Sequence, residues 1–181
     1  MNIRATLAVI GLLAAISLVS VISTQTFAVT TLSSEQESQI RENCVSIKST
    51  LNQLHASDAL LRVNRGQVYE SMGAKLMNRF NGRLSSNGLD IKGLSLVSDN
   101  YQTALTNFRS DYQQYERQLS AAIAIDCTRD PQAFHLSLEE ARTKRQKVHD
   151  DVIKLHQYID DYRSAVNDFK LNFERLSEDN K

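Results

Sequence analysis

Apolar residues recur along positions 134 to 176 at steps that alternate between four and three. This spacing places them on one stripe of an α-helix, as in helices that pack against one another along their length. One member of the stripe is charged. The stripe consists of Phe134, Leu138, Ala141, Arg145, Val148, Val152, Leu155, Ile159, Tyr162, Val166, Phe169, Phe173 and Leu176. It predicts a coiled-coil-like helix over 131–176, which Asp130 as N-cap and Pro131 as first helical residue would begin.

The stretch 35–84 predicts another helix of this kind. Ser34 and Glu37 have the spacing of a capping box, which begins a helix. The stripe that follows steps by four and three and, near its end, by four alone. Its members are Ile40, Cys44, Ile47, Leu51, Leu54, Asp58, Leu61, Arg65, Val68, Met72, Leu76, Phe80 and Leu84. Gly66 and Gly73 lie beside it, and we expect them to allow close approach by a neighbouring helix, with a hinge as the alternative.

A third stripe predicts a helix over 90–126, after the turn-rich segment 84–93 in which Asp90 can act as a cap. Its members are Leu94, Ser98, Tyr101, Leu105, Phe108, Tyr112, Tyr115, Leu119 and Ala122. An aromatic stripe can form a ligand groove or a base-stacking surface. We expect core packing instead, because the aromatic residues occupy the buried positions of the helix.

Turn residues are scarce, with 6 Gly and 1 Pro in 181 residues, which argues against a fold of many strands. Helices joined by short loops predict an all-α fold: an elongated, antiparallel, up-down-up three-helix bundle over 33–176. At about 1.5 Å per residue, this bundle would be roughly 65–75 Å long. Residues 177–181 are expected to form a frayed tail.

The N-terminal residues 1–28 differ from the rest. Residues 5–22 are uncharged and follow Arg4, and a Thr-Phe-Ala sequence ends at Ala28. This is the composition of a secretory signal peptide cleaved after Ala28. An uncleaved membrane anchor is the alternative, because the apolar run is nearly long enough to cross a bilayer. Both interpretations predict an extracytoplasmic chain that touches the membrane only through 5–22, and only if that segment is uncleaved.

Cys44 and Cys127 are the only cysteines. If the first two helices form a hairpin near residue 86, both cysteines lie at about the same distance from the turn and therefore at the same level. Two cysteines in an exported chain favour a bridge over free thiols. We therefore expect a Cys44–Cys127 disulfide that locks the turn before the last helix.

Asp58 and Arg145 are polar exceptions in apolar stripes. Counting along the helices from the expected disulfide places Asp58, Arg145 and Tyr112 at one level, as a buried polar layer in which the phenol covers or hydrogen-bonds the ion pair. Such a layer would set the register of the helices, and a buried charged site for a ligand or proton is the alternative. By the same count, Arg65 would face Asp151.

No pattern in the sequence predicts catalysis. There is no glycine-rich phosphate loop, nucleophile elbow or CxxC pair. The nearest approach to a metal-ligand set is His149, Asp150, Asp151, His156, Asp160 and Asp161. Its two histidines lie about 10 Å apart on one helix, too far to share an ion without another helix. We expect no enzyme activity, no cofactor and no metal. Lys plus Arg and Asp plus Glu are both 21, so nucleic acid is not an expected partner.

Three segments carry a resemblance to known proteins: NRGQVYESMGAKLMNRF at 64–80, NFRSDYQQYERQL at 107–119 and LEEARTKRQKVHDDVIKLHQYI at 138–159. With the export segment and the two cysteines, the chain resembles a group of small exported helical proteins of candidate-phylum bacteria. The resemblance implies a helical fold and an extracytoplasmic location. It implies no activity, because none is assigned to the group.

These features predict a non-enzymatic, exported helical-bundle protein. It would act as a structural, spacer or protein-binding element of the cell envelope, with a protein partner that the sequence does not identify. The alternative is a chaperone-like periplasmic protein that binds unfolded clients. Client binding needs exposed apolar surface, and the apolar residues here fall almost wholly on the expected buried stripes, so we rank this alternative second.

Overall fold

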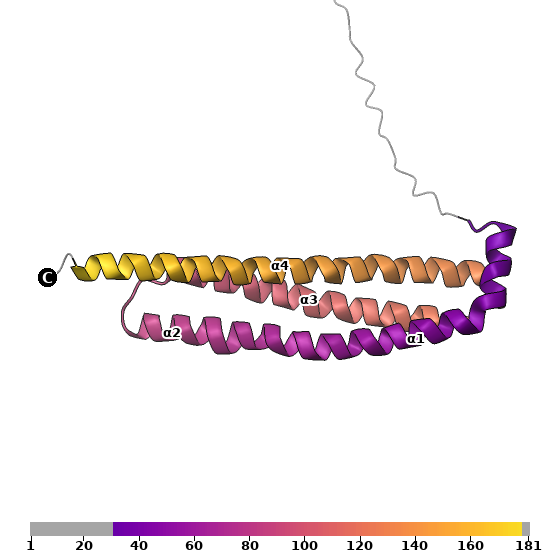
Figure 1. Cartoon of the computed structure of the whole chain (residues 1–181), viewed down its shortest axis with the longest axis horizontal. Coiled ribbons are helices and arrows are strands. Elements are labelled where there is room, and N and C mark those ends of the chain that lie inside the picture. Colours follow the sequence, from indigo (N-terminus) through magenta and orange to yellow (C-terminus); the bar gives the residue numbers. More distant parts are fainter. Residues whose placement is uncertain (1–30, 179–181) are drawn as a thin grey trace, which may run out of the picture. The chain divides into compact units, whose positions relative to one another are not determined.

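The computed structural model describes residues 31–178 of the chain. Within this range every regular element is helical: α1 (Ser34–Ser71), the π-helical segment η1 (Met72–Met77), α2 (Asn78–Ser86), α3 (Lys92–Ala124) and α4 (Pro131–Glu178). α1, η1 and α2 follow one another without a break, so the chain forms three long helical runs, which lie side by side (Figure 1). The described part of the protein is therefore all-α. The expected signal or anchor segment 1–28 and residues 179–181 of the expected tail lie outside the described residues.

α1 begins one residue earlier than the expected capping box indicated. Ser33 is the N-cap: its Oγ accepts a hydrogen bond from the Gln36 amide at 3.3 Å, and its own amide donates to Gln36 Oε1 at 2.9 Å. Ser33 and Ser34 are both followed three residues later by Gln or Glu, so the capping-box pattern occurs twice. The expected Ser34–Glu37 box is wrong by this one residue.

α4 begins at the expected residue, Pro131. The Asp130 carboxylate accepts a hydrogen bond from the Ala133 amide at 2.9 Å, which satisfies one of the free amides of the first turn. At its other end α4 continues to Glu178, beyond the expected end at residue 176. The turn between α2 and α3 contains Gly88 with φ of 72°, a conformation that glycine adopts without strain.

α3 lies at the centre of the apolar core. Every position of its expected stripe is buried: Leu94, Ser98, Tyr101, Leu105, Phe108, Tyr112, Tyr115, Leu119 and Ala122. The core consists of two clusters along this helix. Leu105 packs with Leu155 of α4 in one of them, and Leu119 packs with Phe134 of α4 in the other. α3 and α4 therefore bury their apolar faces against each other along most of their length.

Two positions of the expected α1 stripe lie outside the core. Leu61 and Val68 are 53% and 54% exposed, whereas Tyr69, one residue further on, is 3% exposed. From Tyr69 the buried positions continue at steps of four to Gly73 and Met77. A π-helical segment has more residues per turn than an α-helix, so steps of four stay on one face across η1. The expectation that Leu61 and Val68 belong to the core is wrong, whereas Met72, Phe80 and Leu84 of the same stripe do pack against it.

Gly73 marks the closest approach of this run to α3. A Cβ atom at Gly73 would collide with Gln102 Nε2 and lie 3.2 Å from Tyr101 Cε1. The Tyr101 ring is held in place, because its hydroxyl donates a hydrogen bond to the Tyr69 carbonyl oxygen at 2.7 Å. A Cβ atom at Gly66 would meet nothing within 4 Å. The close-approach interpretation therefore applies to Gly73 and not to Gly66.

The start of α1 is attached to the connection between α3 and α4. Cys44 and Cys127 form a disulfide with their Cα atoms 5.6 Å apart, so the structure brings the expected pair together. Arg41 donates a hydrogen bond to the Thr128 carbonyl oxygen at 2.6 Å. Figure 1 shows that the first turns of α1 run at an angle to the rest of the helix. A covalent bond and a hydrogen bond thus hold these turns in place.

Alanine substitutions at the two glycines form a matched test of this packing. Gly66→Ala should raise the free energy of unfolding by up to about 1 kcal/mol, because alanine is the better helix former and its methyl group meets nothing. Gly73→Ala should lower it by roughly 1 kcal/mol or more, because the Tyr101 ring cannot move aside. Denaturant unfolding of both variants measures the difference. Effects of the same sign would contradict the contact at Gly73.

Candidate functional site

Asp58 of α1 joins all three helical runs through its side chain. Arg145 of α4 donates to both carboxylate oxygens, from Nε at 3.0 Å and from Nη2 at 3.2 Å. The Tyr115 hydroxyl of α3 donates to Asp58 Oδ2 at 2.7 Å. Hydrogen bonds to an ionised carboxylate are stronger than those between neutral groups. The structure therefore brings Asp58 and Arg145 together and adds a phenol to them.

That phenol belongs to Tyr115 and not to Tyr112. The Tyr112 hydroxyl is buried without a hydrogen-bond partner in residues 31–178, and its ring lies 5.4 Å from the Arg62 guanidinium carbon. The count from the disulfide treated α1 as straight. The first turns of α1 run at an angle to the rest (Figure 1). Asp58 therefore advances less far along α3 and meets Tyr115, which is nearer than Tyr112 to Cys127 in the sequence. The expected position of Tyr112 in the layer is wrong by one helical turn.

The cluster around Asp58 is only partly buried. The Asp58 side chain is 11% exposed, but that of Arg145 is 53% exposed, so water screens the ion pair. The expected sealed layer is therefore not formed. Burial, and then the hydrogen bond to Asp58, raise the pKa of the Tyr115 phenol. Tyr115 thus remains a protonated donor at neutral pH.

An open groove begins at this cluster and runs between α1, α3 and α4. It is bounded by residues 58–69 of α1, 108–115 of α3 and 145–156 of α4, and its volume is about 600 Å³. We term it the central groove. At its far end the Tyr69 hydroxyl and the His156 Nε2 atom lie 3.1 Å apart. α1 contacts α3 and α4 at both ends of the groove but not along its length, and the groove therefore stays open.

A carboxyl pair joins α3 to α4. Asp111 is 6% exposed and accepts a hydrogen bond from Lys147 at 3.1 Å. One Asp151 oxygen is buried and faces the Asp111 carboxyl, so the two groups can share a proton. Burial and the neighbouring Asp111 raise the pKa of Asp151 to about 6. The expected contact between Arg65 and Asp151 is not formed, because Asp151 points toward α3 rather than α1.

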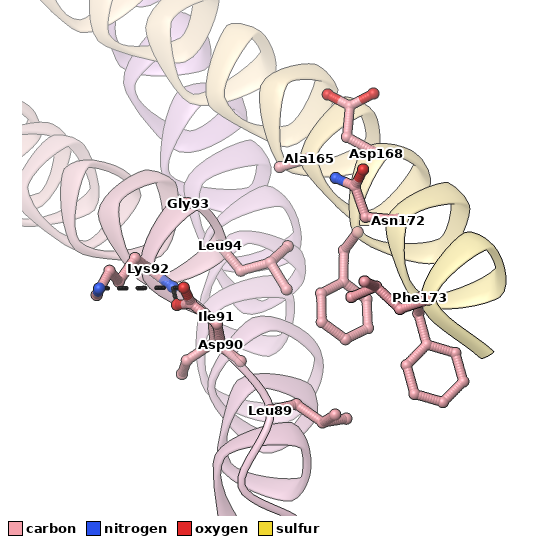
Figure 2. Close-up of a pocket in the computed structure, with 12 residues that line it drawn as sticks. Leu89, Asp90, Ile91, Lys92, Gly93, Leu94, Ala165, Asp168, Asn172 and Phe173 are labelled. Atoms are coloured by element: carbon pink, nitrogen blue, oxygen red, sulfur yellow. Dashed lines mark hydrogen bonds and ion pairs between the residues drawn. The ribbon is translucent and has the colours of Figure 1, made fainter. Parts of the chain in front are cut away.

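A smaller groove of about 430 Å³ lies between the segment 89–94 and the last turns of α4 (Figure 2). The Phe169 and Phe173 rings stack with centroids 6.3 Å apart, and Phe173 is 50% exposed. Figure 2 shows Phe173 on the α4 side of the groove and Leu89 on the opposite side. We term this groove and the two phenylalanines the apolar tip.

Across the described part of the chain, no three His, Cys, Asp or Glu side chains are grouped so that they could hold a metal ion. His149 and His156 line the central groove, whereas Asp151 faces α3, so the ligand set considered from the sequence does not converge. None of the helices between residues 31 and 178 has an apolar run long enough to cross a membrane.

Comparison with family models, with curated proteins and with solved structures finds no match to the chain. Sequence reasoning missed Tyr115 and Arg62 as parts of the site. Tyr115 and Tyr112 belong to the same apolar stripe of α3. The two can be told apart only by knowing which position along α3 lies opposite Asp58. Arg62 follows Asp58 by four residues and lines the groove. The expected stripe stepped by three from Asp58 to Leu61 and therefore passed over Arg62.

Removal of each tyrosine hydroxyl tests the assignment of the phenol. Tyr115→Phe should lower the free energy of unfolding by about 1–2 kcal/mol, because the nearly buried Asp58 carboxylate loses a donor. Tyr112→Phe should leave stability unchanged or raise it slightly, because its buried hydroxyl has no partner to lose. Thermal and denaturant unfolding measure both variants. A larger loss for Tyr112→Phe would contradict the observed layer and favour the one expected from the sequence.

Proposed function

We propose that this protein is a non-enzymatic, exported helical-bundle protein that binds a protein partner at the cell envelope. In this proposal the helical runs follow an up-down-up course and also act as a spacer. The Cys44–Cys127 disulfide supports the location, because such bonds persist in oxidising compartments outside the cytoplasm. The proposal includes no cofactor and no nucleic-acid partner.

The apolar tip is the observation that carries this proposal. Phe173 is 50% and Leu176 is 59% exposed near the end of α4, and both line the groove formed with the segment 89–94. Exposed apolar groups gathered beside a groove are typical of interaction sites. Asp168 also lines this groove, and none of the ion pairs within residues 31–178 involves it. The matching partner surface is an apolar side chain next to a lysine or arginine.

A chaperone-like function is the second candidate, and α1 provides the observation that favours it. Leu60, Leu61, Val63 and Val68 are each about half exposed or more, although the stripe had indicated burial for two of them. Exposed apolar side chains spread along a helix suit many clients, whereas a compact tip suits one partner. The number of different proteins captured therefore distinguishes the two functions.

Photo-crosslinking in the native cell tests the proposal. A photoreactive residue in place of Phe173 should capture one discrete protein, which mass spectrometry identifies. The same residue in place of Ile153, which is 45% exposed on α4 away from the tip, is the matched control and should not capture that protein. Replacement of Asp168 by lysine, combined with the Phe173 crosslinker, should reduce the yield, because it repels the basic group of the partner.

Three results would contradict the proposal. Equal capture from the Phe173 and Ile153 positions would show that the tip is not selective. Capture of a broad set of unrelated proteins from a crosslinker at Leu61 would support the chaperone-like function instead. Absence of any adduct at Phe173 in the native cell would remove the binding function of the tip.

A further inference from the structure

The central groove has the size of a small-molecule site. Its volume of about 600 Å³ lies within the range of about 300–1,000 Å³ that is common for ligand pockets. Along α1 it spans residues 58–69, and along α4 it spans residues 145–156. Each span is roughly 16 Å at about 1.5 Å per residue, shorter than a docked helix of typical length would need. An occupant of this size contacts α1, α3 and α4 at once.

Positive charge is in excess in the groove. Among residues 31–178, Asp58 is the only acidic residue that lines it, and Arg145 already pairs with Asp58 at 3.0 Å. Arg62 and Arg65 lie on adjacent turns of α1, where residues three apart are neighbours. Neither takes part in an ion pair within residues 31–178. Two guanidinium groups are thus available to one acidic group, which arginine binds through paired hydrogen bonds.

The floor of the groove is aromatic and apolar. Phe108 and Tyr112 are each 4% exposed at its base, and Val148 and Val152 line the α4 side. The Arg62 guanidinium lies 5.4 Å from the Tyr112 ring centroid, which places positive charge directly over this floor. The Tyr112 hydroxyl is a buried donor without an acceptor in the described part of the chain. A cationic rim thus lies beside a floor that favours apolar groups.

We propose that the central groove binds a small amphiphilic anion. Its acidic head, a carboxylate or a phosphate, lies between Arg62 and Arg65, and its apolar body packs against Phe108 and Val152. This binding site is separate from the apolar tip, so it does not depend on the protein partner proposed above.

Fluorescence titration of the purified full chain with anilinonaphthalene sulfonate, an aromatic anion, tests the proposal. The probe should bind saturably at one molecule per chain, and laurate and dodecyl phosphate should displace it. Dodecanol, which has the same apolar body without the acidic head, should displace it poorly. The relative potency of laurate and dodecyl phosphate shows which acidic head the arginines prefer.

Arginine variants locate the probe. The double variant Arg62→Gln/Arg65→Gln should weaken binding about tenfold or more, because the acidic group loses both charged donors. The matched control Arg83→Gln/Arg117→Gln removes the same charge from exposed positions outside the groove and should leave the affinity unchanged. Thermal unfolding of both double variants shows that they are folded. Equal affinity in the two double variants, or equal displacement by dodecanol and laurate, would overturn the proposal. So would loss of probe binding in Phe173→Ser alone, because it would place the probe at the apolar tip.

Discussion

The disulfide between Cys44 and Cys127 determines how α1 lies against the other helices. α3 and α4 bury their apolar faces against each other, but α1 contributes few fully buried side chains, chiefly Leu51 near the disulfide and Tyr69 near η1. The bond joins residues 83 apart in the sequence. In the chain-entropy model, closing a loop of this length stabilises the folded state by about 4–5 kcal/mol. A helix with so little buried surface of its own gains most from such a constraint.

Attachment at two places and separation between them account for the central groove. Toward the start of α1, the disulfide and Leu51 hold the helix to its neighbours, and at the other end Gly73 allows the backbone to approach Tyr101. Between these contacts α1 presents Arg62 and Arg65 beside the half-exposed Leu61, and the helices do not close on one another. The Asp58–Arg145 pair crosses this gap at one end. A polar bridge that water can reach is compatible with an open groove, whereas a sealed apolar layer is not.

The accuracy of the sequence reasoning differs between helices for a physical reason. The stripe of α3 is buried on both sides by neighbouring helices, so its apolar spacing reports its inward face directly. α1 packs against the other helices on one side only and buries few side chains there. Apolar residues such as Leu61 can therefore remain exposed at little cost. Its spacing therefore indicated a helix correctly but misplaced single positions such as Leu61 and Val68, whereas Met72, Phe80 and Leu84 of the same stripe pack against the core. The Asp58–Arg145 contact was found because it depends on the level along the helices, which the cysteine positions indicate. The error between Tyr112 and Tyr115 arose because the bend in α1 leaves no local signal in the sequence.

Hydrogen exchange of the oxidised and reduced protein, followed by mass spectrometry, is the most direct test of this account. Reduction should increase exchange in the first half of α1, from Ser34 to about Leu54, while the middle of α3 and α4 around Leu105 and Leu155 stays protected. A Cys44→Ser/Cys127→Ser variant without reductant should give the same pattern, which separates the bond from any other effect of the reductant. Unchanged exchange in α1 after reduction, or an equal loss of protection in all three helical runs, would contradict the claim that the disulfide holds α1 against a stable α3–α4 pair.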